Sequence, residues 1–169
     1  MSLAIAIGTT VLSIVGTAVP ATRGAVETAP RCAPGNTVVW LALSADSGAG
    51  STFVTLEMTN LSRHTCTLYG FPGVSTVDLT GRQVGAAATR DRATPAREVR
   101  LSPGQTAGAQ LRIAHVGNFP TSACRPVQAA GFRVYLPGAT RSKLVPFPVR
   151  ACSMTGPVFL DVRVVAAAT

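Results

Sequence analysis

Residues 52–59 read TFVTLEMT and residues 106–114 read TAGAQLRIA. Apolar residues occupy every second position in both stretches: Val54, Leu56 and Met58 in the first, and Ala107, Ala109, Leu111 and Ile113 in the second. A period of two places one set of side chains on one face of an extended chain and the other set on the opposite face. Both stretches therefore predict half-buried β-strands.

Shorter stretches of the same kind flank these two. We expect strands at 38–43, which contains Trp40 and reads as a buried strand, and at 65–69, 74–79, 82–88, 98–101, 132–136 and 158–164. Residues 144–149 contain Pro146 and Pro148, which restrict that segment to an edge strand. We expect loops at 45–51, 89–97 and 115–128. Strands at this spacing, with few helix formers, predict an all-β fold: an antiparallel, two-sheet, Ig-like β-sandwich.

Four cysteines, Cys32, Cys66, Cys124 and Cys152, lie behind an apolar N-terminal stretch. An even cysteine count downstream of an export-like segment indicates an oxidising compartment and disulfides. Three pairings are possible, and we favour Cys32–Cys66 with Cys124–Cys152. Each bond then closes a loop of about 30 residues, which the chain-entropy model values at about 3–4 kcal/mol.

The N-terminal stretch has no charged side chain up to Thr22 and is apolar from Leu3 to Val19. We interpret residues 1–21 as a signal peptide that forms a short helix, although no Lys or Arg precedes its apolar part. The alternative is an uncleaved membrane anchor, since about 20 apolar residues can span a bilayer. Residues 22–31 then form a linker, and residues 32–169 form one sandwich domain.

Three segments resemble one known family: Thr59-Asn60-Leu61-Ser62, then 66–74 (CTLYGFPGV), then 101–107 (LSPGQTA). The family consists of secreted actinobacterial proteins with four cysteines and is catalogued only as a domain of unknown function (DUF4232-like). The resemblance spans roughly residues 32–165. It implies an exported or lipid-anchored β-sandwich, with no enzymatic activity and no established ligand. Because Cys32 is not preceded by a lipobox, release is favoured over lipid anchoring.

The net charge is +8, with fourteen arginines and one lysine. Five arginines gather in one hairpin-and-loop segment: Arg82, Arg90, Arg92, Arg97 and Arg100. Guanidinium groups bind phosphate and carboxylate in two-pronged fashion, so this segment is our candidate anion-binding face. The alternative interpretation is a solvated loop. Nucleic acid is disfavoured, because the compartment is wrong and aromatic residues for base stacking are few.

Catalytic and metal sites find little support in the sequence. No G-x-S-x-G or H-E-x-x-H motif is present, and the seven acidic residues are scattered. His64 and His115, with Met58 or Met154, could suit copper, but no spacing requires it. Asn60-Leu61-Ser62 fits a glycosylation sequon, yet we expect Asn60 to shape a turn. We predict no catalytic residues, no metal site and no cofactor.

These observations predict a secreted, non-catalytic binding or structural module of the cell envelope or extracellular space. Its partner would be an anionic envelope polymer or another secreted protein, with membrane contact only through an uncleaved leader. The alternative is a secreted inhibitor or partner-protein binder that presents the 89–97 or 115–123 loop from the sandwich.

Overall fold

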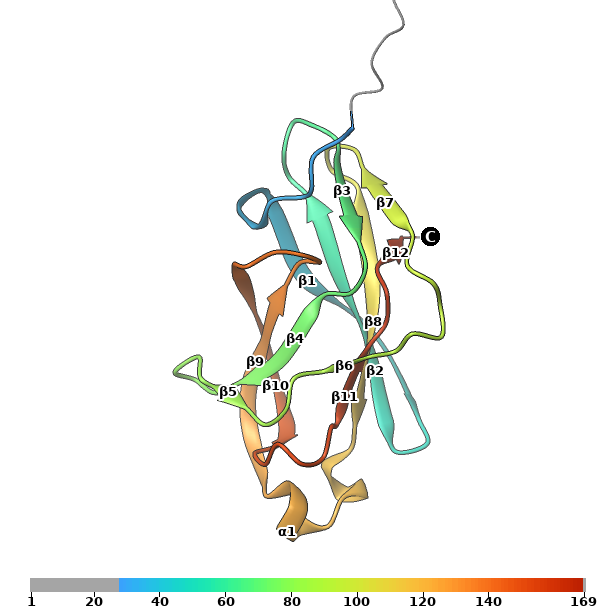
Figure 1. Cartoon of the computed structure of the whole chain (residues 1–169). Coiled ribbons are helices and arrows are strands. Elements are labelled where there is room, and N and C mark those ends of the chain that lie inside the picture. The colour runs from blue at the N-terminus through green and yellow to red at the C-terminus, as the bar shows by residue number, and fades with distance from the viewer. Residues whose placement is uncertain (1–27, 169) are drawn as a thin grey trace, which may run out of the picture.

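The structure is a computed structural model that describes the backbone of residues 28–168 and their side chains except those of residues 43–47. Two sheets pack face to face, and a small pair of strands closes one end (Figure 1). The first sheet has the order β1 (Thr37–Gly48), β2 (Ser51–Asn60), β8 (Thr106–Ala114), β11 (Leu160–Val162), β6 (Thr89–Arg90), with β12 (Ala166–Ala167) also pairing with β8. The second sheet has the order β10 (Ser142–Cys152), β9 (Pro126–Tyr135), β4 (Gly73–Val77), β5 (Gln83–Val84). The closing pair is β3 (Cys66–Tyr69) with β7 (Glu98–Leu101).

The predicted antiparallel sandwich is confirmed. The parallel pairings among the described residues are β11 with β6 and one isolated bridge between Arg31 and Thr67. The core lies between the sheets and is built from the alternating apolar positions. Leu56 of β2 and Leu111 of β8 are fully buried from one side, and Phe132 of β9 is fully buried from the other.

The strand predicted as buried at 38–43 is longer and less buried than expected. β1 is the edge strand of the first sheet, so only alternate residues face the core: Val39 is buried, whereas Val38 and Trp40 are 40% and 44% exposed. The apolar run therefore spans both faces of the strand, and the continuous-burial interpretation was wrong.

The loop predicted at 45–51 is also wrong. β1 continues to Gly48, β2 begins at Ser51, and only Ala49 and Gly50 turn the chain. Both have positive φ, 43° and 76°, which a tight two-residue hairpin requires. The Nδ2 of Asn118 donates to the Gly50 carbonyl at 2.8 Å, and this contact ties the hairpin to the opposite loop.

The remaining expected loops contain short elements. The 115–128 segment holds two helical turns, η2 (Val116–Asn118) and α1 (Thr121–Cys124), before β9 begins. The 89–97 segment begins with β6, and the return strand expected at 82–88 is only the two-residue β5. The first described helical turn, η1 (Pro34–Asn36), precedes β1. No helix in the described part of the chain is long and apolar enough to cross a membrane.

Both predicted disulfides are confirmed. Cys32–Cys66 joins the start of the domain to β3, and Cys124–Cys152 joins the end of α1 to the end of β10. The backbone contacts of the domain begin slightly earlier, since the N–H of Thr67 donates to the Pro30 carbonyl at 2.8 Å. The predicted signal peptide, residues 1–21, lies outside the described residues, as does most of the predicted linker.

Asn60 shapes the turn after β2, as expected. Its side chain is fully buried, and its Nδ2 donates to the carbonyls of His64 and Leu101, each at 2.9 Å. Its Oδ1 accepts from the backbone N–H of Ser62 at 2.9 Å. The side chain thus links the end of the first sheet to the closing pair of strands.

Candidate functional site

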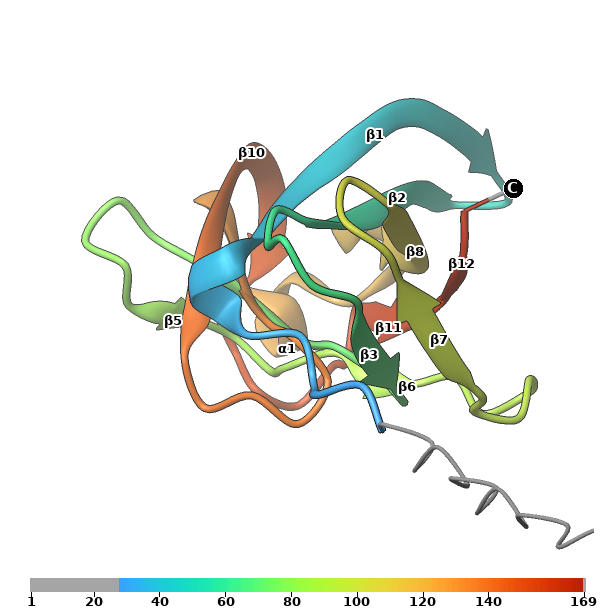
Figure 2. The same ribbon diagram turned by 90° about the horizontal axis from the view of Figure 1, so that it is seen from above.

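The five arginines that are close in sequence do not form one cluster. Arg82 belongs to the hairpin between β4 and β5, where it lies 3.2 Å from Asp78. In both Figures 1 and 2, β5 lies on the opposite side of the molecule from β7, the strand that carries Arg100. Arg100 is itself 3.7 Å from Glu98.

Of the other three arginines, Arg90 ends β6, and Arg92 and Arg97 lie in the connection that runs from β6 to β7. The guanidinium of Arg90 lies over the Phe71 ring, 5.9 Å from its centroid. Arg92 and Arg97 are exposed in the connection from β6 to β7, and no carboxylate among the described side chains lies within ion-pair distance of either. The candidate anion-binding face therefore narrows to Arg92 and Arg97.

The two histidines lie at opposite ends of β2. A nitrogen of the His115 ring is 3.2 Å from the Thr52 hydroxyl, near the start of the strand, while His64 follows the Asn60 turn at its end. They are therefore too far apart to share one metal ion. No group of three or more His, Cys, Asp or Glu side chains within the described residues is arranged to hold a metal.

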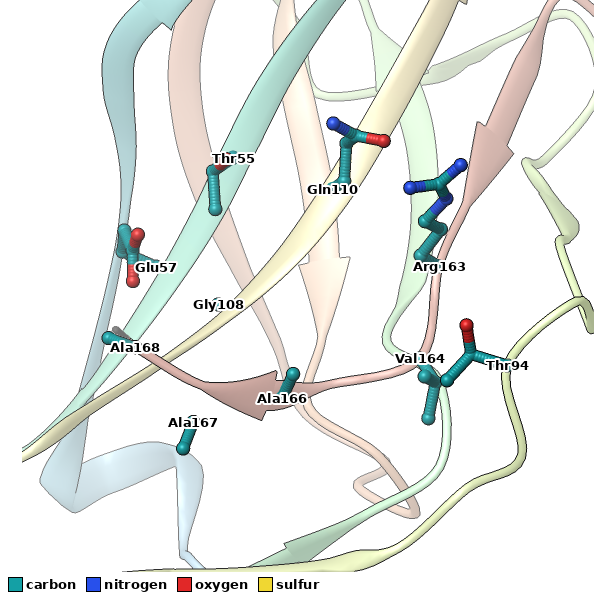
Figure 3. Close-up of a pocket in the computed structure, with 10 residues that line it drawn as sticks. All are labelled: Thr55, Glu57, Thr94, Gly108, Gln110, Arg163, Val164, Ala166, Ala167 and Ala168. Carbon is teal, nitrogen blue, oxygen red and sulfur yellow. The ribbon is translucent and has the colours of Figure 1, made fainter.

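A polar hollow, which the sequence analysis missed, lies on the outer face of the first sheet. Its volume is about 350 Å³. It is lined by Thr55, Glu57, Thr94, Gly108, Gln110, Arg163, Val164, Ala166, Ala167 and Ala168. Figure 3 shows Thr55 and Glu57 on one side, Arg163 and Thr94 on the other, and Gln110 between them. The strand register produces this arrangement, because Glu57 of β2 pairs with Gly108 of β8, and Gly108 pairs with Ala166 of β12.

Glu57 is the unusual group of the hollow. Its Oε2 is shielded from solvent and has no hydrogen-bond partner. Gly108 forms the floor beside the carboxylate: a Cβ there would touch each carboxylate oxygen at 3.4 Å, an ordinary contact, and would crowd the Thr55 methyl at 3.0 Å. Desolvation raises the pKa of Glu57 above its usual 4.5.

On the opposite wall of the hollow, the charged side chains are paired with one another. The Nε of Arg163 lies 3.1 Å from Asp91 Oδ2, and Arg112 pairs with Asp161 nearby. The pKa of Asp91 is lowered, first by the hydrogen bond from the Ala93 N–H and then by the bond from Arg163. The loop that carries Thr94 is thereby held beside the hollow.

Trp40 is the neighbour of Glu57 on the side of β1, outside the residues that line the hollow. It pairs directly with Glu57 across the strands, and residues directly opposite in such a pair project from the same face. Its indole Nε1 donates to the Thr59 hydroxyl at 3.1 Å, and that hydroxyl lies 2.8 Å from the Thr106 hydroxyl. These bonds fix an exposed aromatic ring beside an unpaired carboxylate.

A second hollow of about 390 Å³ lies between the end of β8 and β10. Its walls are largely apolar, including Ile113, Phe147 and Val149. The Phe147 ring stacks on the core ring of Phe132 at 5.7 Å, so this space continues the core at an open end of the sandwich. The first hollow has the more specific chemistry, because several polar groups converge on it around one uncompensated charge.

The sequence indicates that some residues of the first hollow point outward from their strands, but not that they meet. Thr55, Glu57 and Gln110 occupy outward positions of two alternating strands. Their meeting depends on β2 pairing with β8 in this register, across about 50 intervening residues, and no local pattern specifies that pairing.

Comparison with known proteins identifies a family for this chain. A model of the family described as "Domain of unknown function (DUF4232)" matches residues 32–166. No curated protein and no solved structure matches the chain.

Proposed function

Because the chain belongs to the DUF4232 family over the whole of its sandwich, we propose that it is a secreted, non-catalytic binding module of the cell envelope or extracellular space. The hollow around Glu57 is the observation that carries this proposal. It combines a half-open volume, converging polar groups and one unpaired carboxylate, which are features of ligand sites. The sheet that bears it belongs to a sandwich stapled by two disulfides.

The two disulfides also support the extracellular part of the proposal. Structural disulfides persist in oxidising compartments and are rare where thiols are kept reduced. The sequence resemblance points to the envelope of an actinobacterium as the setting. The net charge of +8 favours attraction to anionic envelope polymers. Arg92 and Arg97 are suited to this role, because both are exposed and flank Thr94 at the rim of the hollow.

Cosedimentation of the purified protein with actinobacterial envelope fragments tests this function. We expect retention at low ionic strength that weakens as salt is added, because exposed charges are screened. Replacing Arg92 and Arg97 by Ser should reduce retention. The matched control is the replacement of Arg82 and Arg141 by Ser, which removes the same charge from exposed positions away from the hollow. Absence of retention at any salt concentration would refute an envelope-binding role.

A partner-protein binder is the second candidate, and one observation favours it. Leu79, in the hairpin between β4 and β5, is 96% exposed, and Leu144 of β10, which lines the same shallow hollow, is 62% exposed. Arg133 donates to the Gly81 carbonyl and braces this hairpin against β9. A pull-down from culture supernatant would test this candidate. Capture of one stoichiometric protein by the wild type, but not by the Leu79→Ser variant, would support it. If no protein is captured, this candidate is contradicted.

A further inference from the structure

We propose that the hollow over Gly108 binds the ammonium group of a small polar ligand, with Glu57 as its counter-ion. This inference rests on the proposed binding function and names the chemistry of its ligand. The Glu57 carboxylate has no counter-ion among the described side chains.

Glu57 differs from the other carboxylates of the described structure. The side chains of five acidic residues are described, and four of them lie within ion-pair distance of an arginine: Asp78 with Arg82, Asp91 with Arg163, Glu98 with Arg100, and Asp161 with Arg112. Glu57 has no such partner among the described side chains. A partly desolvated carboxylate without a counter-charge carries a free-energy cost that a cation bound beside it would reduce.

The surroundings of Glu57 fit an ammonium group. An ammonium has three N–H donors and no acceptor, so it needs several oxygen acceptors around it. The two oxygens of the Glu57 carboxylate are such acceptors, and Thr55 and Gln110 place a hydroxyl and an amide on the same face of the sheet. A bare divalent cation fits less well, because Glu57 is the only carboxylate among the residues that line the hollow.

The rest of the hollow fits a ligand with further polar groups. Thr94 and Arg163 offer hydrogen-bond donors across from Glu57, and the alanines of β12 give a small apolar wall. Trp40, fixed beside Glu57 by its bond to Thr59, presents an aromatic surface that attracts cations. A polyhydroxylated amine, such as an amino sugar with a free amino group, satisfies these features together.

Titration with matched amines tests the inference. The probes are glucosamine and butylamine, each compared with a neutral partner, N-acetylglucosamine or butanol. Trp40 is the only tryptophan, so its fluorescence reports binding, and the amide signals of Gly108 and Gln110 in ¹⁵N NMR spectra locate the site. At about pH 6.5 the amines are protonated, and we expect them, but not their neutral partners, to shift these signals.

The substitution Glu57→Gln keeps the shape of the side chain and removes its charge. We expect it to weaken amine binding by about ten- to a hundredfold, the value of a hydrogen bond to a charged group. Asp78→Asn is the matched control, since it removes a carboxylate that already has an arginine partner, and it should bind amines like the wild type. Equal responses of wild type and Glu57→Gln, or no response to amines at millimolar concentration, would overturn the inference.

The same variants separate this inference from the proposed envelope function. If the wild-type protein is not retained by envelope fragments at any salt concentration, but amines still bind at Glu57, the envelope role is wrong and the amine site stands. If envelope retention is intact in Glu57→Gln and amines do not shift the Trp40 and Gly108 signals, only the amine site is wrong.

Discussion

The two faces of the β2–β8 pair are built from alternate residues of the same two strands, and they differ in how their polar and apolar groups are satisfied. On the inner face, Leu56 and Leu111 are fully buried and belong to the hydrophobic core. On the outer face, Glu57 leaves a shielded oxygen without a partner beside the bare backbone of Gly108. Stability thus resides in one set of alternate positions and the candidate ligand chemistry in the other. Substitutions can test how independent the two sets are.

The largest effect is expected from Leu56→Ala on the inner face. Removing a fully buried leucine loses its transfer free energy and leaves a cavity, and such changes cost about 2–5 kcal/mol. The free energy of unfolding from urea titration measures this cost. Thr55→Ala, one residue away on the outer face, should lower it by about 1 kcal/mol or less, because a half-buried threonine loses only its strand propensity and a few contacts. A comparable loss in both variants would show that the two faces are not separate.

The next effect is expected from Asn60→Ala, where a buried polar side chain has all of its partners. The substitution strands the Leu101 carbonyl and the Ser62 N–H, and an unsatisfied buried group costs about 1–3 kcal/mol. The urea midpoint should fall while the slope of the unfolding transition stays constant. An unchanged midpoint would mean that water replaces these bonds and that Asn60 does not hold the closing strands.

A smaller effect of opposite sign is expected from Glu57→Gln. Burial raises the pKa of Glu57, so its ionised form opposes folding, and the stability of the wild type falls as pH rises through that pKa. The variant should therefore have the higher Tm at neutral pH. The difference should vanish below about pH 4, where the carboxyl is protonated in both the folded and unfolded states. Thermal unfolding at several pH values measures it, and a lower Tm of the variant at neutral pH would contradict a desolvated, unpaired carboxylate.

The smallest effect is expected from Asp78→Asn, in the exposed hairpin. Hydrogen bonds from Thr80, above all from its hydroxyl, and from Arg82 lower the pKa of Asp78 to about 2. Ionised Asp78 therefore stabilises the hairpin above about pH 3.8, and this contribution is lost as pH falls toward 2. The variant should lack it at all pH values. Amide hydrogen exchange at Thr80 and Arg82 should be faster in the variant at neutral pH and equal to the wild type in strong acid.

Much of the fold could be predicted because strand alternation is local. Leu56 and Phe132 occupy the inward positions that their own strands indicate, and the four cysteines pair as loop size suggested. Trp40 was placed wrongly, because an apolar run in an edge strand divides between two faces. The Ala49–Gly50 turn was hidden among small residues that are also typical of loops.

The candidate site was harder to predict because it depends on pairing. Glu57 faces Gly108 only through the register of two strands that are distant in sequence. The arginine cluster shows the converse error: Arg82 and Arg100 are near in sequence but lie on opposite sides of the sandwich, and each has an acidic partner. Proximity in sequence therefore suggested an arginine cluster that the fold separates, and it gave no indication of the hollow around Glu57.

Two of the edge strands, β1 of the first sheet and β10 of the second, differ in how they would meet another strand. In β10 the backbone at Pro146 and Pro148 has no N–H to donate, and the pairing with β9 is irregular between Pro146 and Val149. β1 contains no proline, and although its pairing with β2 is irregular between Ala42 and Asp46, Thr37 to Ala42 pair without interruption. Such interruptions discourage edge-to-edge aggregation. Any self-assembly by strand addition at high concentration should therefore begin at β1 rather than β10, and a proline placed there would be the natural change for a more soluble variant.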